Sequence, residues 1–263
     1  MANRTPRRSR PKGCARCAER GKEAFDWDIR MAFQPIVDLA SGGIFAHEAL
    51  VRGPDGQGAG EVLSRVNHDN RYAFDQTCRV VAIESAARLG IPDPISINFM
   101  PNAVYNPENC IQTTLWTADK YDFPLERIVF EFTETESVSD LAHLKNIFEE
   151  YHGHGFRTAI DDFGSGYSGL LRLADLRPDF VKLDMDLTRD IQNHPRRRKI
   201  VSAMVALCAD LDITLVAEGI ETEDEASCLF DMGICIQQGF LFARPAFDSF
   251  VPRDALDFCR AAA

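Results

Sequence analysis

An α/β fold arranged as a TIM-like (βα)8 barrel is predicted by three features of the sequence. Short apolar runs alternate with longer amphipathic segments from about residue 25 onward. The hydrophobic residues of the short runs cluster instead of alternating with polar ones, which is typical of parallel strands buried on both faces. The alternation continues over roughly 240 residues, a usual length for such a barrel.

Six segments are predicted strands and three are predicted helices. The strands are ISINFM (95–100), RIVFEF (127–132), RTAIDDF (157–163), FVKLDM (180–185), ITLVAEG (213–219) and ICIQQGF (234–240). The helices are DLAHLKNIFEEYHGHG (140–155), RRRKIVSAMVALCADLD (196–212) and ETEDEASCLFDMG (221–233), each with an apolar stripe at helical spacing. The rival fold is an open doubly wound sheet, which usually has a glycine-rich phosphate loop after its first strand. The segment FQPIVDLASGG (33–43) is not such a loop, so the barrel is favoured.

Composition indicates an ordinary globular protein. Hydrophobic residues make up 45% and charged residues 26% of the 263 residues. No window approaches the roughly 18 uninterrupted apolar residues of a membrane span, so none is expected. The N-terminal MANRTPRRSRPK is basic but lacks the apolar segment of a secretory signal, and a cytoplasmic location is therefore expected.

Charge divides the chain into two parts. Residues 1–22 carry eight Lys/Arg and one Glu, while the remaining residues carry 21 Lys/Arg and 39 Asp/Glu. We expect residues 1–25 to be a basic, flexible leader and residues 26–263 to be one catalytic domain. The acidic body would repel a phosphate backbone, so duplex nucleic acid is not an expected partner. Contact of the leader with nucleic acid or anionic lipid is the alternative to a solvated tail.

Eight cysteines are scattered along the chain, which argues for reduced thiols and against a disulfide framework. Only Cys14 and Cys17 form a CxxC pair, and one such pair is half of a zinc site. The pair could bind an additional metal ion, contribute to a metal site shared between two chains, or have a redox function. The alternative is that its spacing is incidental.

Polar residues recur where the predicted strands end, which is where a barrel builds its active site. They are Glu48 after the run GGIFAH, Asn98, Glu131, Asp161, Asp162, Lys182, Asp184, Glu218, Glu221 and Gln238. A single residue of this kind is more often a helix cap or a loop residue, but recurrence at consecutive strand ends indicates one shared site. Asp161 and Asp162 are adjacent, so both face one site only if the strand breaks there, and FGSGYSG supplies a break.

Convergent carboxylates predict bound cations. Several carboxylates in one site repel one another unless cations neutralise them. None of the six histidines has a metal-ligand spacing such as HExxH, and oxygen ligands favour Mg²⁺ or Mn²⁺ over Zn²⁺. Two such ions about 3.5–4 Å apart are suited to holding the attacking and leaving oxygens of a phosphoryl displacement.

Eight motifs in order make residues 28–250 resemble the EAL family of cyclic di-GMP phosphodiesterases. They are FQPIV (33–37), EALVR (48–52), IN (97–98), EFTE (131–134), DDFGSGYSGL (161–170), KLD (182–184), AEGIE (217–221) and QGFLFARP (238–245). The resemblance implies a TIM-like barrel with one antiparallel strand, and hydrolysis of cyclic di-GMP to linear pGpG with two Mg²⁺ or Mn²⁺ ions. Departures from the family are Met100 where many members have Ser, GSGYSG for GTGYSS, and Phe240 for Tyr; none removes a metal ligand.

The resemblance also implies roles for individual residues. The positions that match ligands of a first metal are Glu48, Asn98, Glu131 and Asp161, and those of a second are Asp161, Asp162 and Glu218. Lys182 resembles the residue that orients the attacking water, and the other members of this catalytic group are Glu48, Glu221, Gln238 and Glu134. The substrate-binding positions are Gln34, Leu50, Arg52 and Asp184, with Arg52 suited to a phosphate.

Alternatives to an enzyme of this family remain open. The main one is a non-catalytic EAL-like module that binds cyclic di-GMP or a protein, although every mapped position is intact; another metal-dependent barrel enzyme is a further one. For Lys182, the alternative is a surface cation paired with Asp184 or Asp162. About 25 residues precede the catalytic region in this sequence, so a cyclase or sensor domain is not expected in it. Regulation is therefore expected from homodimerisation, an unidentified protein partner or the leader.

Overall fold

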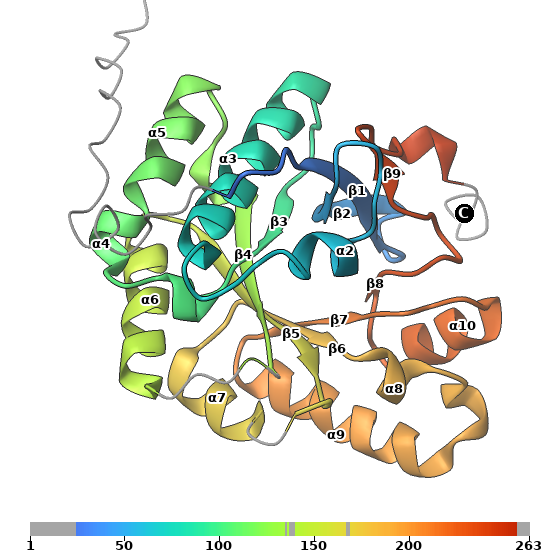
Figure 1. Cartoon of the computed structure of the whole chain (residues 1–263). Helices are drawn as coiled ribbons and strands as arrows, with labels where there is room; N and C mark the ends of the chain where they lie inside the picture. Colours follow the sequence, from blue (N-terminus) through green and yellow to red (C-terminus); the bar gives the residue numbers. More distant parts are fainter. Residues whose placement is uncertain (1–24, 135, 137–139, 167–168, 257–263) are drawn as a thin grey trace, which may run out of the picture.

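The computed structural model describes residues 25–134, 136, 140–166 and 169–256, and the predicted leader with Cys14 and Cys17 lies outside these residues. Eight strands form a closed barrel in the order β2-β3-β4-β5-β6-β7-β8-β1, and pairing of β1 with β2 completes the circle (Figure 1). β1 runs antiparallel to both β2 and β8, whereas the other neighbours are parallel. The predicted TIM-like barrel with one antiparallel strand is confirmed.

The barrel strands differ in length, from two residues in β8 to ten in β2. They are β1 (Arg30–Asp38), β2 (Gly43–Arg52), β3 (Ile95–Asn98), β4 (Ile128–Thr133), β5 (Arg157–Phe163), β6 (Phe180–Leu183), β7 (Thr214–Ala217) and β8 (Ile236–Gln237). A ninth strand, β9 (Ala246–Phe247), pairs with β1. β5 has the predicted bounds, and β8 is much shorter than the predicted 234–240. Nearly every residue of β4 and β6 is buried, as expected for strands covered on both faces.

Helices surround the barrel (Figure 1). They are α2 (Ala59–Leu63), α3 (Arg71–Leu89), α4 (Pro107–Cys110), α5 (Gln112–Lys120), α6 (Leu141–Gly153), α7 (Gly169–Leu176), α8 (Met185–Thr188), α9 (Pro195–Asp210) and α10 (Glu223–Asp231). The three predicted helices correspond to α6, α9 and α10. The longest of the described helices, α3, is not among the predicted ones, because the buried charged residues Asp75 and Arg79 interrupt its apolar stripe.

The hydrophobic core has two parts. One large cluster of buried residues occupies the layer between the barrel and the helices. Two small clusters, separate from it, lie on the opposite face of the strands: Ile36, Ala46 and Val216 form one, and Val129, Ala159 and Phe180 form the other. These six residues fill one end of the barrel interior with apolar side chains, and the other end, toward the C-terminal ends of the parallel strands, is left for polar residues.

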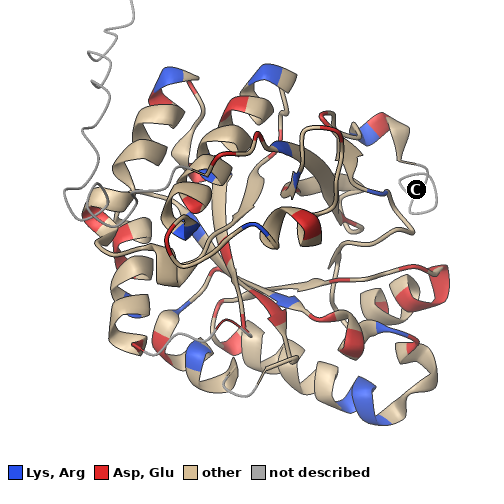
Figure 2. Ribbon diagram, viewed as in Figure 1, with Lys and Arg blue, Asp and Glu red and all other residues tan. Residues whose placement is uncertain are grey.

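Charged residues outside the barrel lie both on the helices and in the loops. Figure 2 shows a basic stretch at the start of α9, where Arg196–Lys199 lie, and acidic residues along α10. In the described part of the chain, no helix is both long enough and apolar enough to cross a membrane.

Candidate active site

Five charged residues of the site each lie two positions after a residue of the two interior clusters. Side chains two apart on a strand share a face, so these charged groups project into the same barrel interior, one layer above the apolar residues. The pairs are Ala46 and Glu48, Val129 and Glu131, Ala159 and Asp161, Phe180 and Lys182, and Val216 and Glu218. Local sequence alternation therefore sets which residues face the site.

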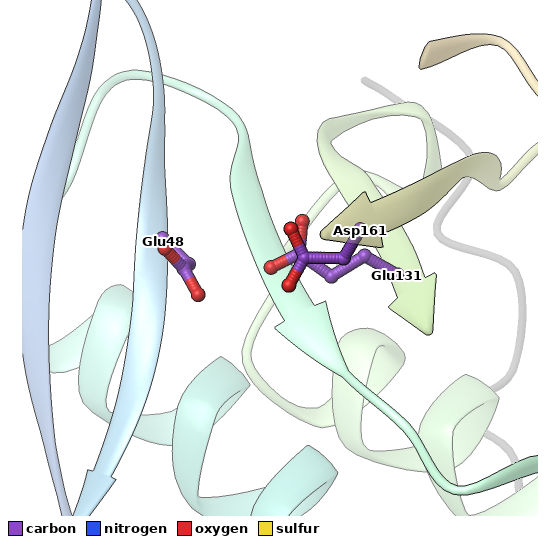
Figure 3. Close-up of side chains that lie close together, drawn as sticks. All are labelled: Glu48, Glu131 and Asp161. Atoms are coloured by element: carbon purple, nitrogen blue, oxygen red, sulfur yellow. The ribbon is translucent and has the colours of Figure 1, made fainter. Parts of the chain in front are cut away.

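Glu48, Glu131 and Asp161 project toward one another from three different strands (Figure 3). All three are buried, and one carboxylate oxygen of each lies within 4.8 Å of the others. The prediction that Glu48 follows the end of a strand is wrong. Glu48 lies in the middle of β2, because pairing with β1 continues the strand to Arg52.

Lys182 is the one cation within ion-pair distance of these carboxylates among the described residues. Its Nζ lies 2.8 Å from Glu218, 3.0 Å from Asp161, 3.4 Å from Glu131 and 3.6 Å from Glu48. The side chain is only 2% exposed. The alternative of a surface cation paired with Asp184 or Asp162 is therefore wrong, since Lys182 is buried and has other partners.

Amide and hydroxyl groups hold two of the carboxylates in place. The Asn98 amide donates to Glu48 at 3.1 Å and to Glu131 at 3.2 Å. The Gln238 amide donates to Glu48 at 2.7 Å and to the side-chain oxygen of Gln34 at 3.3 Å. These contacts bring the predicted residues Gln34, Asn98 and Gln238 to the carboxylates.

Ser96 is a site residue that the sequence analysis does not single out. Its hydroxyl donates to Oε2 of Glu131 at 2.5 Å, and the residue is 2% exposed. Its position two before Asn98 on β3 is the signal that would have identified it, since the two residues share a face.

Asp162 joins a second group of carboxylates with Asp161 and Glu218, whose oxygens also lie within 4.8 Å of one another. Two adjacent residues reach the same region because Asp162 itself has a positive φ of 52°. The pairing of β5 with β6 shifts register between Ile160 and Phe163. The strand therefore breaks as predicted, but the break is at Asp162, a residue type that tolerates the left-handed conformation, and precedes FGSGYSG.

The carboxylates around Lys182, together with Asp162, form an acidic cluster that resists full ionisation, whereas Lys182 stays charged. Burial raises the pKa of Glu131 and of Glu218 well above the usual range, although Lys182 opposes the shift. Burial and the charge of Asp161 raise the pKa of Asp162 to about 6. Burial alone would lower the pKa of Lys182, but the attraction of the carboxylates outweighs it and raises that pKa well above its ordinary value.

A cavity of about 320 Å³ adjoins the cluster. Its wall combines Glu48, Asn98 and Asp161 with apolar side chains such as Leu50, Phe74 and Met100. Such a mixture of a few polar groups with apolar walls is typical of a small-molecule site. The predicted substrate-binding residue Leu50 lines this cavity.

Other predicted residues lie at the edge of the cluster or outside it. Arg52, at the end of β2, is half-buried, donates to the carbonyl of Val51 at 2.7 Å and has its pKa lowered by burial. The Asp184 carboxylate accepts from the backbone N–H of Asp186 at 2.7 Å and caps α8. Glu221 is 48% exposed and pairs with Arg189 at 2.8 Å, away from Lys182.

Glu134 supports the loop that follows β5. Its buried carboxylate accepts from the backbone N–H groups of Gly164 at 2.8 Å and Gly166 at 3.2 Å. Arg172 donates to its backbone carbonyl. Glu134 thus contacts the loop beside Asp162, and no contact with Lys182 is found among the described residues.

The sequence of this chain is similar to those of known proteins. The sequence profile of the EAL domain matches residues 22–245. The blue light- and temperature-regulated antirepressor BluF of Escherichia coli is 31% identical over 214 residues, which cover 81% of this chain and 53% of BluF. The cyclic di-GMP phosphodiesterase RocR of Pseudomonas aeruginosa is 32% identical over 173 residues, which cover 66% of this chain and 43% of RocR. The chain thus spans about half the length, or less, of these relatives.

The solved structures with the same fold include the following two. A standalone versatile EAL protein of Vibrio cholerae O395, in its c-di-GMP-bound form, has a TM-score of 0.84 and 52% identity, covering 86% of this chain and 96% of that chain. BlrP1 of Klebsiella pneumoniae, in a manganese and cyclic di-GMP complex, has a TM-score of 0.80 and 33% identity, covering 84% of this chain and 56% of that chain. Most of the described barrel is therefore similar to proteins solved with cyclic di-GMP.

Proposed function

This chain belongs to the EAL domain family, and from that premise we propose that it hydrolyses cyclic di-GMP to linear pGpG. The observation that carries the proposal is a set of two adjoining clusters, each made of three carboxylates. The clusters share Asp161, and Lys182 is the one cation paired with them among the described residues. Such an excess of buried negative charge is stable only with protons or cations bound. Divalent cations would bring the positive charge that a phosphodiester substrate needs.

The donor set fits Mg²⁺ or Mn²⁺. Its oxygens come from carboxylates and one amide, which these hard cations prefer. Glu48, Asn98, Glu131 and Asp161 would hold one ion, and the residues for the second are Asp161, Asp162 and Glu218. When bound, the two ions would neutralise phosphate charge and acidify the attacking water.

Lys182 is proposed to orient the attacking water. Its raised pKa keeps the ammonium charged, so it donates hydrogen bonds and is a poor proton acceptor. In the reaction, the water oxygen bonds to phosphorus, the bond to a ribose 3′ oxygen breaks and that oxygen takes a proton. Holding the water in line with the breaking bond is a positioning effect, which can supply much of a phosphoryl-transfer rate.

Neighbouring groups are proposed to preorganise the site. Gln238 and Asn98 orient Glu48, and Ser96 orients Glu131, through the hydrogen bonds described above. Outer contacts of this kind commonly fix the direction of metal ligands. Glu134 is proposed to act on catalysis by ordering the Gly164–Gly166 loop, and Glu221 through the segment that follows Glu218.

The substrate is proposed to occupy the cavity beside Glu48. Gln34 and Leu50 would contact a guanine, and Arg52 would contact a phosphate, for which its planar guanidinium is suited. Asp184 would contribute at the edge of the site near Asp162. Arg52 is half-buried and forms no ion pair among the described residues, although the nearby charge of Glu48 opposes the lowering of its pKa, and this supports an anionic ligand there.

A second candidate function is binding of cyclic di-GMP without hydrolysis. The similarity to a protein named as an antirepressor favours this alternative, because that name describes a regulator and not a phosphodiesterase. The intact set of carboxylates and Lys182 favours the enzyme. A receptor needs affinity for the nucleotide but no ordered water.

The test is incubation of the purified chain with cyclic di-GMP, with and without Mn²⁺ or Mg²⁺, followed by separation of the nucleotides. We expect pGpG only when the cation is added, and loss of turnover after chelation. Saturable nucleotide binding without turnover in either cation would identify the receptor. Undiminished hydrolysis after thorough chelation would refute the metal-dependent mechanism.

We propose further that residues 26–263 act as one domain and that a protein partner or the leader sets the activity of this domain.

The chain is also proposed to form a homodimer. Two adjacent leucines on α7, Leu170 and Leu171, are 63% and 70% exposed, which favours contact with a second copy. Light scattering would measure the mass in solution. A monomer throughout the micromolar range would contradict the dimer.

A further inference from the structure

We propose that the buried ion pair of Asp75 and Arg79 on α3 is a positioning device for Asn98 and Glu131, the candidate metal ligands on β3 and β4. The inference rests on the proposed function. Nε of Arg79 lies 2.8 Å from Oδ2 of Asp75, and their side chains are 0% and 1% exposed. The pair lies outside the barrel wall, in the layer between the strands and α6.

Asp75 holds the chain where it leaves β3. Its second carboxylate oxygen accepts from the backbone N–H of Met100 at 2.9 Å. Met100 lies two residues after Asn98 and precedes the short 3-10 turn Pro101–Ala103. Asp75, Asn98 and Met100 also line the same cavity. Movement of the Met100 backbone would therefore displace both the amide ligand and the cavity wall.

Arg79 contacts the neighbours of both ligands. Its guanidinium lies 5.5 Å from the ring centroid of Phe99 and 4.9 Å from that of Phe130. Phe99 follows Asn98, and Phe130 precedes Glu131. Adjacent side chains of an extended segment face opposite sides. Holding the two phenylalanines outside the barrel therefore keeps the two ligands directed into it.

Further hydrogen bonds make this arrangement rigid. Arg79 Nη1 donates to the hydroxyl of Tyr151 on α6 at 2.7 Å. The backbone N–H of Phe99 donates to the carbonyl of Glu131 at 2.9 Å, so the two ligand segments are joined beyond the last paired residue of β3. One ion pair thus connects α3, α6 and the ends of β3 and β4.

A stabilising role alone explains the pair poorly. Replacing a buried ion pair by apolar residues of similar size is often neutral or stabilising, because removing two charges from water is costly. What an apolar pair lacks is the directional hydrogen bond to Met100. The geometry therefore points to positioning, and it predicts an effect on metal binding that exceeds the effect on folding.

Two double variants separate these effects. Asp75→Asn/Arg79→Met removes both charges but keeps an acceptor for the Met100 N–H, whereas Asp75→Leu/Arg79→Met also removes the acceptor. Mn²⁺ affinity is measured by calorimetry without nucleotide, and melting temperature is measured on the same samples. We expect Mn²⁺ to bind about 10-fold more weakly to the Leu variant than to the Asn variant, a usual loss for an outer contact of a metal site. Their melting temperatures should agree within a few degrees.

A control and a milder variant complete the test. Asp179→Leu removes the acceptor of the Thr158 N–H (2.7 Å) at the opposite end of β5 and β6, and should lower the melting temperature without changing Mn²⁺ affinity. If the Leu double variant does not fold, Tyr151→Phe removes one bond of Arg79 and should weaken Mn²⁺ binding several-fold. Equal Mn²⁺ affinity in the two folded double variants, or wild-type affinity in Tyr151→Phe, would overturn the inference.

The outcome can be separated from that of the proposed function. Wild-type protein that binds Mn²⁺ but does not hydrolyse cyclic di-GMP would refute the enzyme and leave the comparison of affinities valid. Wild-type hydrolysis together with equal affinities in the double variants would refute the positioning role alone.

Discussion

Replacement of Lys182 by methionine tests the proposed site most directly. The ammonium contacts four carboxylates at 2.8–3.6 Å and is 2% exposed. Methionine retains much of the buried side-chain volume and is unbranched, so it removes the charge with little change in packing. The variant therefore measures what the charge does.

The expected magnitudes follow from the contacts. Loss of one well-placed group that orients the water should reduce kcat by roughly 10²-fold or more. Removing one partner of a buried ion pair costs about 3–5 kcal/mol, which lowers Tm by about 6–20 °C at roughly 2–4 °C per kcal/mol. Proton uptake by Glu131 or Glu218, whose pKa values are already raised, should keep the loss in the lower half of this range. Mn²⁺ should reduce it further by replacing the lost charge.

The assay compares kcat, nucleotide affinity and Tm on one preparation of Lys182→Met. Nucleotide affinity is measured in Ca²⁺, where turnover is expected to stall, and should change far less than kcat. Lys145→Met is the matched control, because Lys145 is 55% exposed and lies 3.9 Å from Glu149 in a surface pair. The control should keep wild-type kcat and Tm, since such pairs contribute little. Wild-type kcat in Lys182→Met, or a fall only in step with lost stability, would refute the role of Lys182.

Three further predictions concern single hydrogen-bonding groups. Glu48→Gln keeps the size of a candidate ligand but removes its charge, so kcat should fall by at least about 10²-fold with a folded protein; near-wild-type turnover would show that Glu48 is not a ligand. Ser96→Ala removes the donor to Glu131 and should raise the Mn²⁺ concentration for half-maximal activity about 10-fold; an unchanged Mn²⁺ dependence would argue against orientation of Glu131 by Ser96. Although burial opposes the shift, backbone hydrogen bonds lower the pKa of Glu225 from its ordinary value in the folded protein. The ionised carboxylate therefore stabilises the fold at pH values above its ordinary pKa, and this stabilisation is lost as the pH falls through the lowered pKa of the folded state. Glu225→Gln should therefore lower Tm at pH 7, and the difference from wild type should disappear in acid; a constant difference in Tm from pH 7 to pH 3 would contradict this.

The strands and the direction of their side chains could be predicted from the sequence. Buried strands leave a local signal, because their apolar residues cluster within a few positions. Alternation then places Glu131, Asp161 and Glu218 on one face, each two residues after an apolar residue that fills the barrel. Recurrence of such residues at successive strand ends predicts a shared acidic site.

Other features depend on contacts between segments far apart in the chain. α3 was not recognisable because Asp75 and Arg79 interrupt its apolar stripe, and their burial is explained only by Met100 and Tyr151. Glu221 has the sequence position of a site residue, yet its contact with Arg189 leaves it outside the cluster. The break at Asp162 depends on the positive φ of that residue, and an aspartate in a short sequence can have either a positive or a negative φ.

The fold class, the strands and the inward-facing acidic residues could be predicted from the sequence, because each strand depends on a pattern of a few adjacent positions and the fold class on the repetition of that pattern. Which of these residues meet depends on the tertiary structure. The four carboxylates around Lys182 come from β2, β4, β5 and the residue after β7, so their distances depend on the register of every strand pair between them. Register and closure of the barrel are properties of the whole chain, and no local pattern contains them.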